Sequence, residues 1–402
     1  MPSLSDLPIT VVVGGKLDDI ETRPLPTFSD QACEFLGSLS RHLLAIPQHR
    51  EYPDLAAFAY WCRPAHLRRL AQQQPRDVCR LGRGLALHIA PANVPVNFAF
   101  SLAFGMLSGN ANIVRLPQKA HPQTEILCQA LRQLLAETGR ERLAAMNRVI
   151  RYPRNDGVTR RLCSLCQARV LWGGDETIAH IRQMPVPARS VEVAFADRYS
   201  MCLLDAVSVC DATPTEMSQL VAGFYNDVYP LDQQACSSPH LVVWRGTEDV
   251  AKVAMDRFWS ALADHVSRRY DLQGVHAVDK YTQLCHLAVE MPDAVHAVRH
   301  GNQIYRVRLK QLPKDTSHLR GRFGLFFEYV TMDIGELRTI VNDKYQTLTC
   351  HGVERPEVAQ WVVSSGLSGI DRIVPVGNAL DIDIVWDGHD LISHLSRIVS
   401  LS

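Results

Sequence analysis

The chain has 402 residues, 47% of them hydrophobic and 21% charged, and its 42 basic and 42 acidic side chains cancel to a formal net charge of zero. A chain of this length usually divides into two or three domains. The balanced charge argues against a protein that binds nucleic acid non-specifically. No stretch approaches the roughly 20 apolar residues that span a bilayer, and the N-terminus lacks the features of a signal peptide. We therefore expect a cytoplasmic protein, with its eleven cysteines reduced.

The first 80 residues are interpreted as packing scaffold. A short strand is predicted at residues 9–13. Apolar residues at helical spacing then predict helices at residues 31–44, 55–62 and 65–74.

The next segment predicts a strand, a helix and a second strand. The apolar run at residues 84–90 indicates a buried strand, residues 91–95 a tight loop, residues 96–108 a helix and residues 112–116 another strand. Strand, helix and strand in this order predict a parallel sheet with a right-handed crossover. Ligands of such sheets bind beyond the carboxyl ends of the strands, which is where Asn93 is expected.

The alternation continues towards the middle of the chain. Helices are predicted at residues 122–137, 158–167 and 176–183, and strands at residues 148–151, 169–172, 190–195 and 200–204. Gly173 and Gly174 lie between a strand and a helix N-terminus, an arrangement that suits a phosphate or a cofactor ribose. The alternative is an ordinary turn from strand to helix.

A cysteine with small and polar neighbours follows the predicted helix at residues 217–228. Cys236 is the centre of Gln-Gln-Ala-Cys-Ser-Ser-Pro at residues 233–239, where small side chains leave room for a substrate carbonyl. A thiolate in such a setting is a nucleophile for acyl carbons and aldehydes, although a free cysteine is more often a small buried hydrophobe.

The last third contains several further elements. Strands are predicted at residues 240–244 and 326–333, and helices at residues 248–268 and 334–341, with a short helix reaching residue 398.

Taken in order, these pieces resemble the aldehyde dehydrogenase superfamily and, within it, the LuxC-like fatty acyl-CoA reductases of the bioluminescence type. The resemblance covers about residues 80–400. Its motifs are residues 88–95, 109–114, 171–175, 198–200, 233–239, 346–348, 372–377 and 386–388.

The resemblance implies an α/β fold with a Rossmann-like cofactor domain, a catalytic α/β domain and a small oligomerisation element. We expect the cofactor domain within residues 1–205, the thiol domain within 206–370 and a returning tail at 371–402. The resemblance also implies NADPH as hydride donor, an acyl-CoA or acyl-protein thioester as substrate, an acyl-protein synthetase partner and a homo-oligomer.

Three catalytic residues are expected. Cys236 would attack the acyl carbonyl, and Asn93 matches the superfamily's oxyanion asparagine, with the Cys236 backbone N–H as second donor. Glu192 lies where the superfamily keeps a catalytic glutamate, although the glycine pair expected after it is replaced by Ala194 and Phe195. The alternatives are a turn residue for Asn93 and an edge-strand carboxylate for Glu192.

Cofactor contacts are expected from six residues. The candidates are Pro91, Ala92, Arg115, Gly173, Gly174 and Glu328. Arg115 and Lys119 are cations near a strand end that suit a 2′-phosphate, but Leu116 falls nearest the position of the usual superfamily lysine. Glu328 would serve the ribose in place of a shifted family glutamate, whereas an exposed carboxylate is its default interpretation.

Several other residues are interpreted as structural. Cys163 and Cys166 have no second Cys or His pair at zinc spacing, so buried thiols are favoured and no metal site is expected. His240 starts a strand and is more simply a structural histidine than a partner of Cys236. Arg372 and Asp387 match motifs of the tail and are candidates for ion pairs.

The sequence thus predicts an NADPH-dependent reductase that converts an acyl thioester to an aldehyde through an S-acyl Cys236 intermediate. Two alternatives remain within the same chemistry, an acylating aldehyde dehydrogenase and an aminoacyl or polyketide thioester reductase. A third, from another class, is a cofactor-free acyl carrier or acyltransferase.

Overall fold

The computed structural model describes residues 3–75, 78–290 and 296–400, and the chain forms two compact units. Unit 1 comprises Met1–Asp197 and Asp383–Ser402, and unit 2 comprises Arg198–Ile382. The predicted boundaries after residues 205 and 370 differ from these, because the strand at residues 199–205 pairs within the sheet of unit 2. The tail from residue 383 returns to unit 1.

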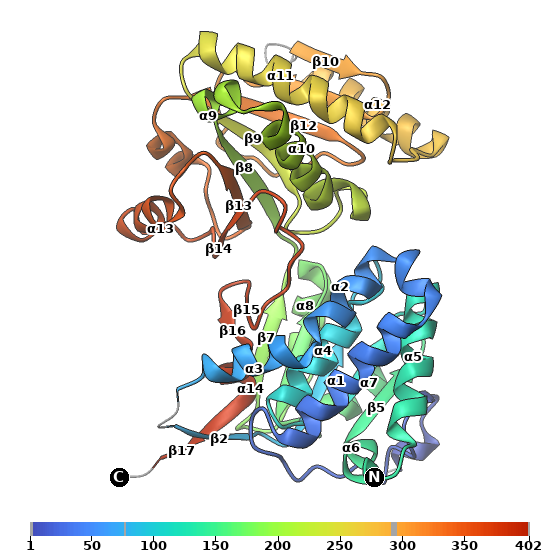
Figure 1. Ribbon diagram of the computed structural model, residues 1–402. Coiled ribbons are helices and arrows are strands. Elements are labelled where there is room, and N and C mark those ends of the chain that lie inside the picture. Colours follow the sequence, from blue (N-terminus) through green and yellow to red (C-terminus); the bar gives the residue numbers. More distant parts are fainter. Residues whose placement is uncertain (1–2, 76–77, 291–295, 401–402) are drawn as a thin grey trace. The chain divides into compact units, whose positions relative to one another are not determined.

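Unit 1 is built on a six-stranded sheet with the order β1-β5-β4-β3-β6-β7 (Figure 1). Its strands are β1 (Thr10–Val13), β3 (Leu85–Ile89), β4 (Ala111–Leu116), β5 (Asn147–Arg151), β6 (Ala168–Trp172) and β7 (Val191–Phe195). Only β1 is antiparallel to its neighbour in this sheet. In the sheet, β4 and β5 lie on one side of β3, and β6 and β7 lie on its other side. The direction in which successive strands are added therefore reverses between β3 and β6, which is the position at which such sheets bind ligands.

Helices and short ribbons complete unit 1. The helices are α1 (Asp30–Ala45), α2 (Pro53–Trp61), α3 (Pro64–Gln72), α4 (Asn97–Leu107), α5 (Pro122–Leu135), α6 (Glu141–Met146), α7 (Asp156–Cys163), α8 (Asp175–Arg182) and α14 (Leu391–Leu395). The ribbons are β2 (Cys79–Gly82) with β17 (Ser396–Val399), and β15 (Val385–Trp386) with β16 (His389–Asp390). Every residue of α4 is buried, as its continuous apolar sequence predicts.

Unit 2 contains a seven-stranded sheet with the order β10-β11-β12-β9-β8-β13-β14. The strands are β8 (Tyr199–Asp205), β9 (Pro239–Arg245), β10 (His296–His300), β11 (Ile304–Arg308), β12 (Leu325–Thr331), β13 (Tyr345–His351) and β14 (Arg372–Pro375). Its helices are α9 (Ala206–Asp211), α10 (Pro214–Val228), α11 (Glu248–Ser267), α12 (Gly274–Glu290) and α13 (Arg355–Ser364), with 3₁₀ turns at Tyr229–Leu231 and Ile334–Thr339.

The sheet of unit 2 has an apolar core on each face. Along β8, Cys202 and Leu204 belong to the core that α10 and α11 cover, and Met201 and Leu203 to the core on the opposite face. This alternation follows from the two-residue period of a strand, and burial on both faces explains the continuous apolar run. Both units are therefore layered α/β structures, as predicted.

Three predicted elements differ from the structure. The helix predicted to reach residue 398 ends at Leu395, and the chain continues as β17 paired with β2. The segment predicted as a helix at residues 334–341 is a 3₁₀ turn over Ile334–Thr339. The helix predicted at residues 158–167 ends at Cys163.

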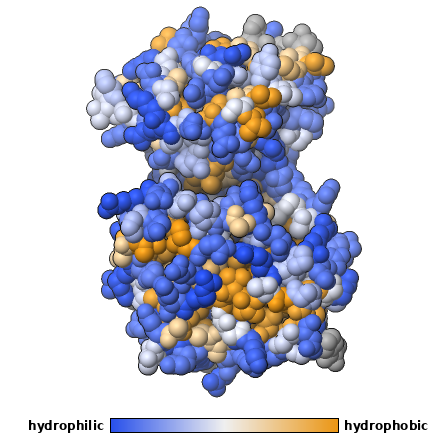
Figure 2. Space-filling view, turned by 90° about the vertical axis from the view of Figure 1, so that its right-hand side faces the viewer, coloured by the Kyte–Doolittle hydropathy of each residue, from blue (hydrophilic) through white to orange (hydrophobic). Residues whose placement is uncertain are grey.

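The surface is mostly hydrophilic on the face shown in Figure 2, with apolar side chains gathered on unit 1. Within the described part of the chain, no helix combines the length and the apolar character needed to cross a membrane.

Candidate active site

Two loops meet at the point where the winding of the unit 1 sheet reverses. Ile89, at the end of β3, pairs with Leu171 of β6 on one side and with Arg115 of β4 on the other. The segments that follow, residues 90–96 and 173–174, therefore leave the same edge of the sheet as neighbours. Pro91, Ala92, Arg115, Gly173 and Gly174, all predicted for the cofactor, are brought to this edge, and Asn93 is exposed in the first of these loops.

The glycine turn after β6 leads directly into α8. Gly174 is the N-cap of this helix, with φ −68° and no side-chain cap. A Cβ added at Gly174 would meet no atom within 4 Å among the described residues, and one at Gly173 would only make ordinary contact with Thr177 at 3.6 Å. Neither the backbone conformation nor the packing of the described chain therefore requires glycine at position 174. A ligand that approaches the backbone closely would require it.

Arg115 presents a polar group with no partner in the described chain. Its side chain is half-buried, its guanidinium lies 5.1 Å from the Tyr152 ring centre, and Nη2 donates a long 3.4 Å hydrogen bond to the Tyr152 carbonyl. Its Nε is buried without a hydrogen-bond partner among the described residues. A buried donor left unpaired is costly, so Arg115 retains a capacity to bind an anion or acceptor.

A buried polar network supports this edge of the sheet. His88 Nδ1 lies 2.8 Å from Ser101 Oγ, which also accepts a hydrogen bond from Trp172 Nε1 at 3.1 Å. His88 Nε2 lies 3.0 Å from Asn112 Oδ1. Burial lowers the pKa of His88 to about 4, so this imidazole is neutral and serves to hold β3, β4 and α4 together.

Glu192 lies on β7, the edge strand of the unit 1 sheet. Oε2 accepts a 2.8 Å hydrogen bond from Arg169 Nε, and Oε1 accepts one of 2.6 Å from Arg182 Nε. Both oxygens are therefore engaged by guanidinium groups. These contacts correspond to the edge-strand carboxylate considered for Glu192 and offer no support for a general base.

The predicted nucleophile lies in unit 2, in a loop between α10 and β9. Cys236 is half-buried, and its backbone carbonyl accepts a 2.7 Å hydrogen bond from Ser200 Oγ at the start of β8. The same hydroxyl accepts a hydrogen bond from the backbone N–H of Thr347 on β13 at 3.1 Å. A single buried serine thus joins the thiol loop to two neighbouring strands.

Gln233 fixes the other end of the thiol loop. It has φ 60°, in the left-handed region, and its side chain is fully buried. Nε2 donates to the carbonyls of Pro239 and Leu325, both at 3.1 Å, and Oε1 accepts from the N–H of Gly324 at 3.0 Å. The amide therefore satisfies three backbone groups, which explains a glutamine at this position better than any contact with substrate.

The candidate residues are thus divided between the units. Asn93 and Glu192 belong to unit 1, together with the candidates at the edge of its sheet, and Cys236 belongs to unit 2.

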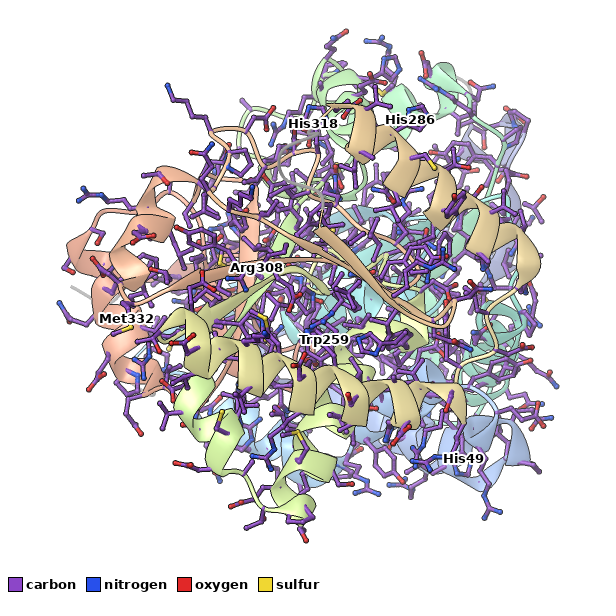
Figure 3. All side chains as sticks on the ribbon, turned by 90° about the horizontal axis from the view of Figure 1, so that it is seen from above. His49, Trp259, His286, Arg308, His318 and Met332 are labelled. Atoms are coloured by element: carbon purple, nitrogen blue, oxygen red, sulfur yellow. The ribbon has the colours of Figure 1, made fainter. Side chains whose placement is uncertain are left out.

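Glu328 lies on β12 in unit 2 and is only 3% exposed, so the default interpretation of an exposed carboxylate is wrong. Its Oε1 accepts hydrogen bonds from the indoles of Trp244 at 3.0 Å and Trp259 at 2.6 Å, and its Oε2 lies 3.6 Å from Arg306. Figure 3 shows Trp259 coming from α11. Burial raises the pKa of Glu328, and the contacts described involve both of its carboxylate oxygens.

The residues interpreted as structural lie in structural surroundings. His240 is buried at the second position of β9. Cys163 and Cys166 are fully buried, and burial raises the pKa of Cys166 to about 12. No group of three metal-ligating side chains forms in the described ranges. Arg372 donates hydrogen bonds to the carbonyls of residues 378, 379 and 381.

Sequence reasoning missed the residues that hold the thiol loop. Ser200 belongs to a motif at residues 198–200 that supported the resemblance, but no role followed from the motif. Asp227 and Ser238, whose contacts are described below, also flank the loop. Their spacing in the sequence shows no pattern, because their partners lie on other elements.

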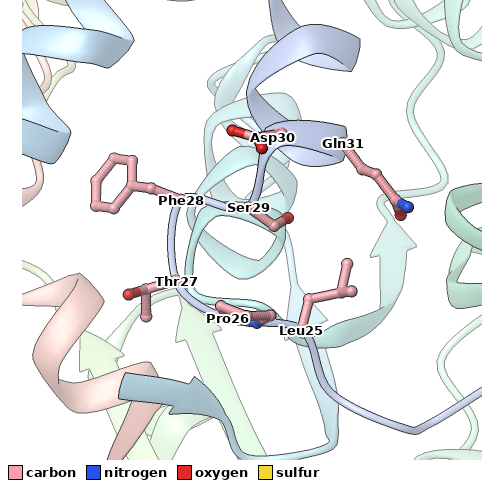
Figure 4. A pocket seen from close by; sticks show the side chains of 7 residues that line it. All are labelled: Leu25, Pro26, Thr27, Phe28, Ser29, Asp30 and Gln31. Carbon is pink, nitrogen blue, oxygen red and sulfur yellow. The ribbon is translucent and has the colours of Figure 1, made fainter. Parts of the chain in front are cut away.

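A surface hollow lies elsewhere in unit 1. Residues 25–31 line it, where the chain turns into α1, and Figure 4 shows the side chains of Phe28 and Gln31 pointing to opposite sides of the turn. None of the predicted site residues lines this hollow.

Solved structures and family models place the chain among known proteins. A mutant of Thermus thermophilus 1-pyrroline-5-carboxylate dehydrogenase aligns with a TM-score of 0.63 at 12% identity over 92% of this chain and 81% of that one. An NAD-dependent benzaldehyde dehydrogenase from Corynebacterium glutamicum gives 0.61 at 10% identity over 92% and 85%. A Thermus 1-pyrroline-5-carboxylate dehydrogenase with bound NAD gives 0.61 at 12% identity over 92% and 80%.

These structures confirm the predicted aldehyde-dehydrogenase-like fold. Among curated proteins, none matches the chain in sequence. The family model described as acyl-CoA reductase (LuxC) matches residues 60–401, which extends over both units and includes the thiol loop. The chain therefore belongs to the acyl-CoA reductase (LuxC) family, as its motifs predicted.

Proposed function

We propose that this protein reduces an acyl thioester to an aldehyde through an S-acyl intermediate on Cys236, with NADPH as hydride donor. The observation that carries the proposal is the half-buried thiol in a loop held by Ser200 and Gln233, in a member of an acyl-CoA reductase family. A loop fixed in this way holds a nucleophile in one geometry, which lowers the entropic cost of attack.

The proposed reaction has two stages, acyl transfer to Cys236 and hydride transfer to the acyl-cysteine. The Cys236 thiolate attacks the acyl carbon, the bond from that carbon to the donor's sulfur breaks, and the donor leaves as a thiolate that takes up a proton. A bound reduced nicotinamide would supply the hydride that converts the acyl-cysteine into the anion of a hemithioacetal, and the nicotinamide would be oxidised. The bond from carbon to Cys236 sulfur then breaks, which releases the aldehyde and regenerates the thiolate.

Both stages build negative charge on the former carbonyl oxygen. Donors fixed around such an oxygen stabilise it, and loss of one donor costs roughly 3 kcal/mol of transition-state stabilisation. We propose the backbone N–H of Cys236 as one donor. Asn93 keeps its proposed role as an oxyanion donor on the strength of the resemblance at residues 88–95.

The edge of the unit 1 sheet fits a dinucleotide. The unpaired Nε of Arg115 and the open space around Gly174 support this proposal. A backbone free of side chains at a helix N-terminus suits a phosphate or ribose, and a cation beside it suits a further phosphate. Residues 91–92 and 173–174 with Arg115 are therefore proposed to hold the cofactor. The preference for NADPH over NADH remains part of the proposal.

Substituting alanine for Gly174 is expected to weaken NADPH binding by about tenfold, equivalent to about 1.4 kcal/mol, without lowering the stability of the protein. The new methyl group meets no described atom within 4 Å, so only a ligand that approaches the backbone would contact it. NADPH fluorescence titration measures binding, and thermal unfolding measures stability. Gly274→Ala is a matched control, because a Cβ there also meets no described atom within 4 Å. Equal binding by both variants would remove Gly174 from the proposed cofactor site.

Glu192→Gln is expected to change the rate of aldehyde formation by less than about threefold and to lower the free energy of unfolding by about 1–2 kcal/mol. The variant loses the negative charge and one of the two oxygens that accept hydrogen bonds from Arg169 and Arg182, but keeps the side-chain shape. Steady-state kinetics and urea unfolding test the two parts. Glu125→Gln, which removes the charge of another surface carboxylate paired with an arginine, is the matched control. A fall of a hundredfold or more in turnover, with unchanged stability, would instead establish Glu192 as a catalytic base.

The identity of the acyl donor and the assembly of the protein are parts of the same proposal. We propose a fatty acyl-CoA or an acyl-protein as substrate, an acyl-protein synthetase as supplier and a homo-oligomer as the working state, on the basis of the family. Light scattering of the purified protein tests the last of these.

Purified protein with a panel of acyl-CoAs, and with either NADPH or NADH, tests the function directly. Oxidation of NADPH with formation of the matching aldehyde supports the proposal, and the most reactive chain length identifies the substrate class. An S-acylated protein that neither binds nor oxidises nicotinamide would instead be the acyl carrier or acyltransferase considered from the sequence.

A further inference from the structure

A segment near the end of unit 2 is held from two sides. This segment, residues 376–381, follows β14 and is called the tail loop here. The Arg372 guanidinium donates hydrogen bonds to three of its carbonyls, those of Asn378 at 2.8 Å, Ala379 at 2.6 Å and Asp381 at 2.5 Å. Its N–H groups are held by a different residue.

Asp227, on the last turn of α10, is the acceptor for those N–H groups. Its side chain is fully buried, Oδ2 accepts from the N–H of Gly377 at 2.7 Å, and Oδ1 accepts from the N–H of Ala379 at 2.8 Å. Both carboxylate oxygens are thus used to bind backbone. A charged acceptor makes such bonds stronger than a neutral one does.

The tail loop also packs directly on the backbone of α10. A Cβ at Gly223, one turn before Asp227, would lie 3.0 Å from the Val376 carbonyl oxygen and 3.2 Å from the Gly377 Cα. Gly377 has φ +104°, a conformation that other residues rarely adopt. Two glycines therefore let helix and loop approach closely enough for Asp227 to reach both N–H groups.

The same turn of α10 holds the thiol loop through its main chain. The Asp227 carbonyl accepts a 2.7 Å hydrogen bond from the fully buried Ser238 hydroxyl, two residues beyond Cys236. The next carbonyl, that of Val228, accepts the N–H of Gln233 at 2.7 Å. The helix end that the tail loop contacts therefore anchors the thiol loop on both sides of the cysteine.

We propose that Asp227 is a positioning residue for Cys236. Asp227 couples the tail loop to the thiol loop through the last turn of α10 and the Ser238 hydroxyl. The inference rests on the proposed function in taking Cys236 as the nucleophile. Asp227 is assigned no contact with the sulfur or with a substrate. It acts by fixing the helix end from which the thiol loop is held.

The coupling depends on the charge of Asp227. Burial raises the pKa of Asp227 to about 7, against the opposing effect of the two N–H donors. Asp381 and Arg372 from the tail face it, as does Cys202 from β8, whose own pKa is raised chiefly by burial. Because burial raises this pKa, the buried carboxyl of the closed loop binds a proton more tightly than a solvated carboxyl would. Acidification through about pH 7 is thus expected to favour the closed tail loop, and a rise in pH through 7 is expected to loosen it and, with it, the thiol loop.

The test compares wild type with Asp227→Asn, Ser238→Ala and the double variant by two measurements. The first is the rate constant of Cys236 S-acylation by acyl-CoA in the absence of nicotinamide, over a range of pH. The second is the alkylation rate of Cys236 by iodoacetamide, read from peptide masses. Cys285 on α12 is exposed and is the internal standard in the same protein. The alkylation arm does not require the proposed reaction, so it separates failure of this inference from failure of the function.

At pH 8, Asp227→Asn is expected to acylate about tenfold more slowly than wild type, because a small misplacement of a reacting atom is costly. Alkylation of Cys236 relative to Cys285 is expected to rise at least about threefold, because a loosened loop exposes the half-buried sulfur. The ratio of wild-type to variant acylation rates should grow as the pH falls through about 7, because only wild type retains the carboxyl whose protonation favours the closed loop. The double variant should be no slower than the slower single one, since both act through one connection.

Two results would overturn the inference. One is a lower free energy of unfolding in Asp227→Asn with unchanged alkylation and an unchanged pH profile, which describes a merely structural carboxylate. The other is additive effects of the two substitutions. If Asp227→Asn does not fold, Ser238→Ala alone tests the coupling, because it removes only the hydrogen bond from Ser238 to the Asp227 carbonyl. Unchanged acylation and alkylation of Cys236 in that variant would reject the coupling.

Discussion

Replacing Cys236 with alanine is expected to lower the rate of aldehyde formation by at least about 10⁴-fold, because removal of a covalent nucleophile leaves only binding and electrostatic contributions. The fold should persist, since the side chain is half-buried and the contacts that hold the loop come from Ser200 and Gln233. Aldehyde formation measured with the preferred acyl-CoA gives the rate, and thermal unfolding shows that the variant is folded.

Cys285→Ala is the matched control for this substitution. Cys285 is an exposed free thiol on another element of the same unit, and its removal should leave the rate unchanged. Residual activity of a tenth or more in Cys236→Ala would show that the acyl group is not carried by this residue. The reaction would then proceed by direct reduction of the bound thioester.

Gln233→Ala is expected to lower the free energy of unfolding by about 3–5 kcal/mol and turnover by about tenfold or more. The substitution leaves two buried carbonyls and one buried N–H, those of Pro239, Leu325 and Gly324, without the partner that the amide supplies. It also releases the end of the loop that carries Cys236. Urea unfolding and turnover at a temperature where the variant is folded measure the two effects.

The neighbouring residue provides a close control. Gln234 is exposed, so Gln234→Ala should change stability by less than about 0.5 kcal/mol. If Gln233→Ala were as stable and as active as Gln234→Ala, the hydrogen bonds described for Gln233 would not hold the loop, and the explanation given for the geometry of the thiol would fail.

Much of unit 1 could be predicted because its signals are local. The run at residues 84–116 contains an apolar strand, an apolar helix and a second strand, and β3, α4 and β4 form the parallel unit that this order requires. The reversal of winding between β3 and β6 was not predictable in the same way. It depends on which side of β3 the later strands pair, and no local pattern encodes this.

Two of the wrong predictions concern residues whose partners are distant in the chain. The segment at residues 396–399 forms β17 because it pairs with β2, more than 300 residues earlier, so its short apolar pattern was mistaken for the end of a helix. The default interpretation of Glu328 as an exposed carboxylate is also wrong, since its side chain is buried. Indoles from β9 and α11 and a nearby arginine make its burial tolerable, and the sequence around residue 328 shows none of them.

The candidate site was predictable to the level of its motifs. The motifs indicated Cys236 and the edge of the unit 1 sheet, because nucleophiles and glycine turns have recognisable local sequences. The supporting contacts of Ser200, Gln233 and Asp227 were invisible, because each is a hydrogen bond between elements. Supporting residues of this kind follow from tertiary structure alone.

The most direct test of the central claim is a two-step mass measurement on Cys236. The protein is first mixed with acyl-CoA alone, and the mass of the peptide containing Cys236 is measured. NADPH is then added to the isolated acylated protein, and the aldehyde is measured as the peptide returns to its free mass. We expect acylation at Cys236 followed by release of one aldehyde for each acyl group on addition of NADPH. Aldehyde formation without acylation of Cys236, or an acyl-cysteine that NADPH leaves unchanged, would contradict the proposed reaction.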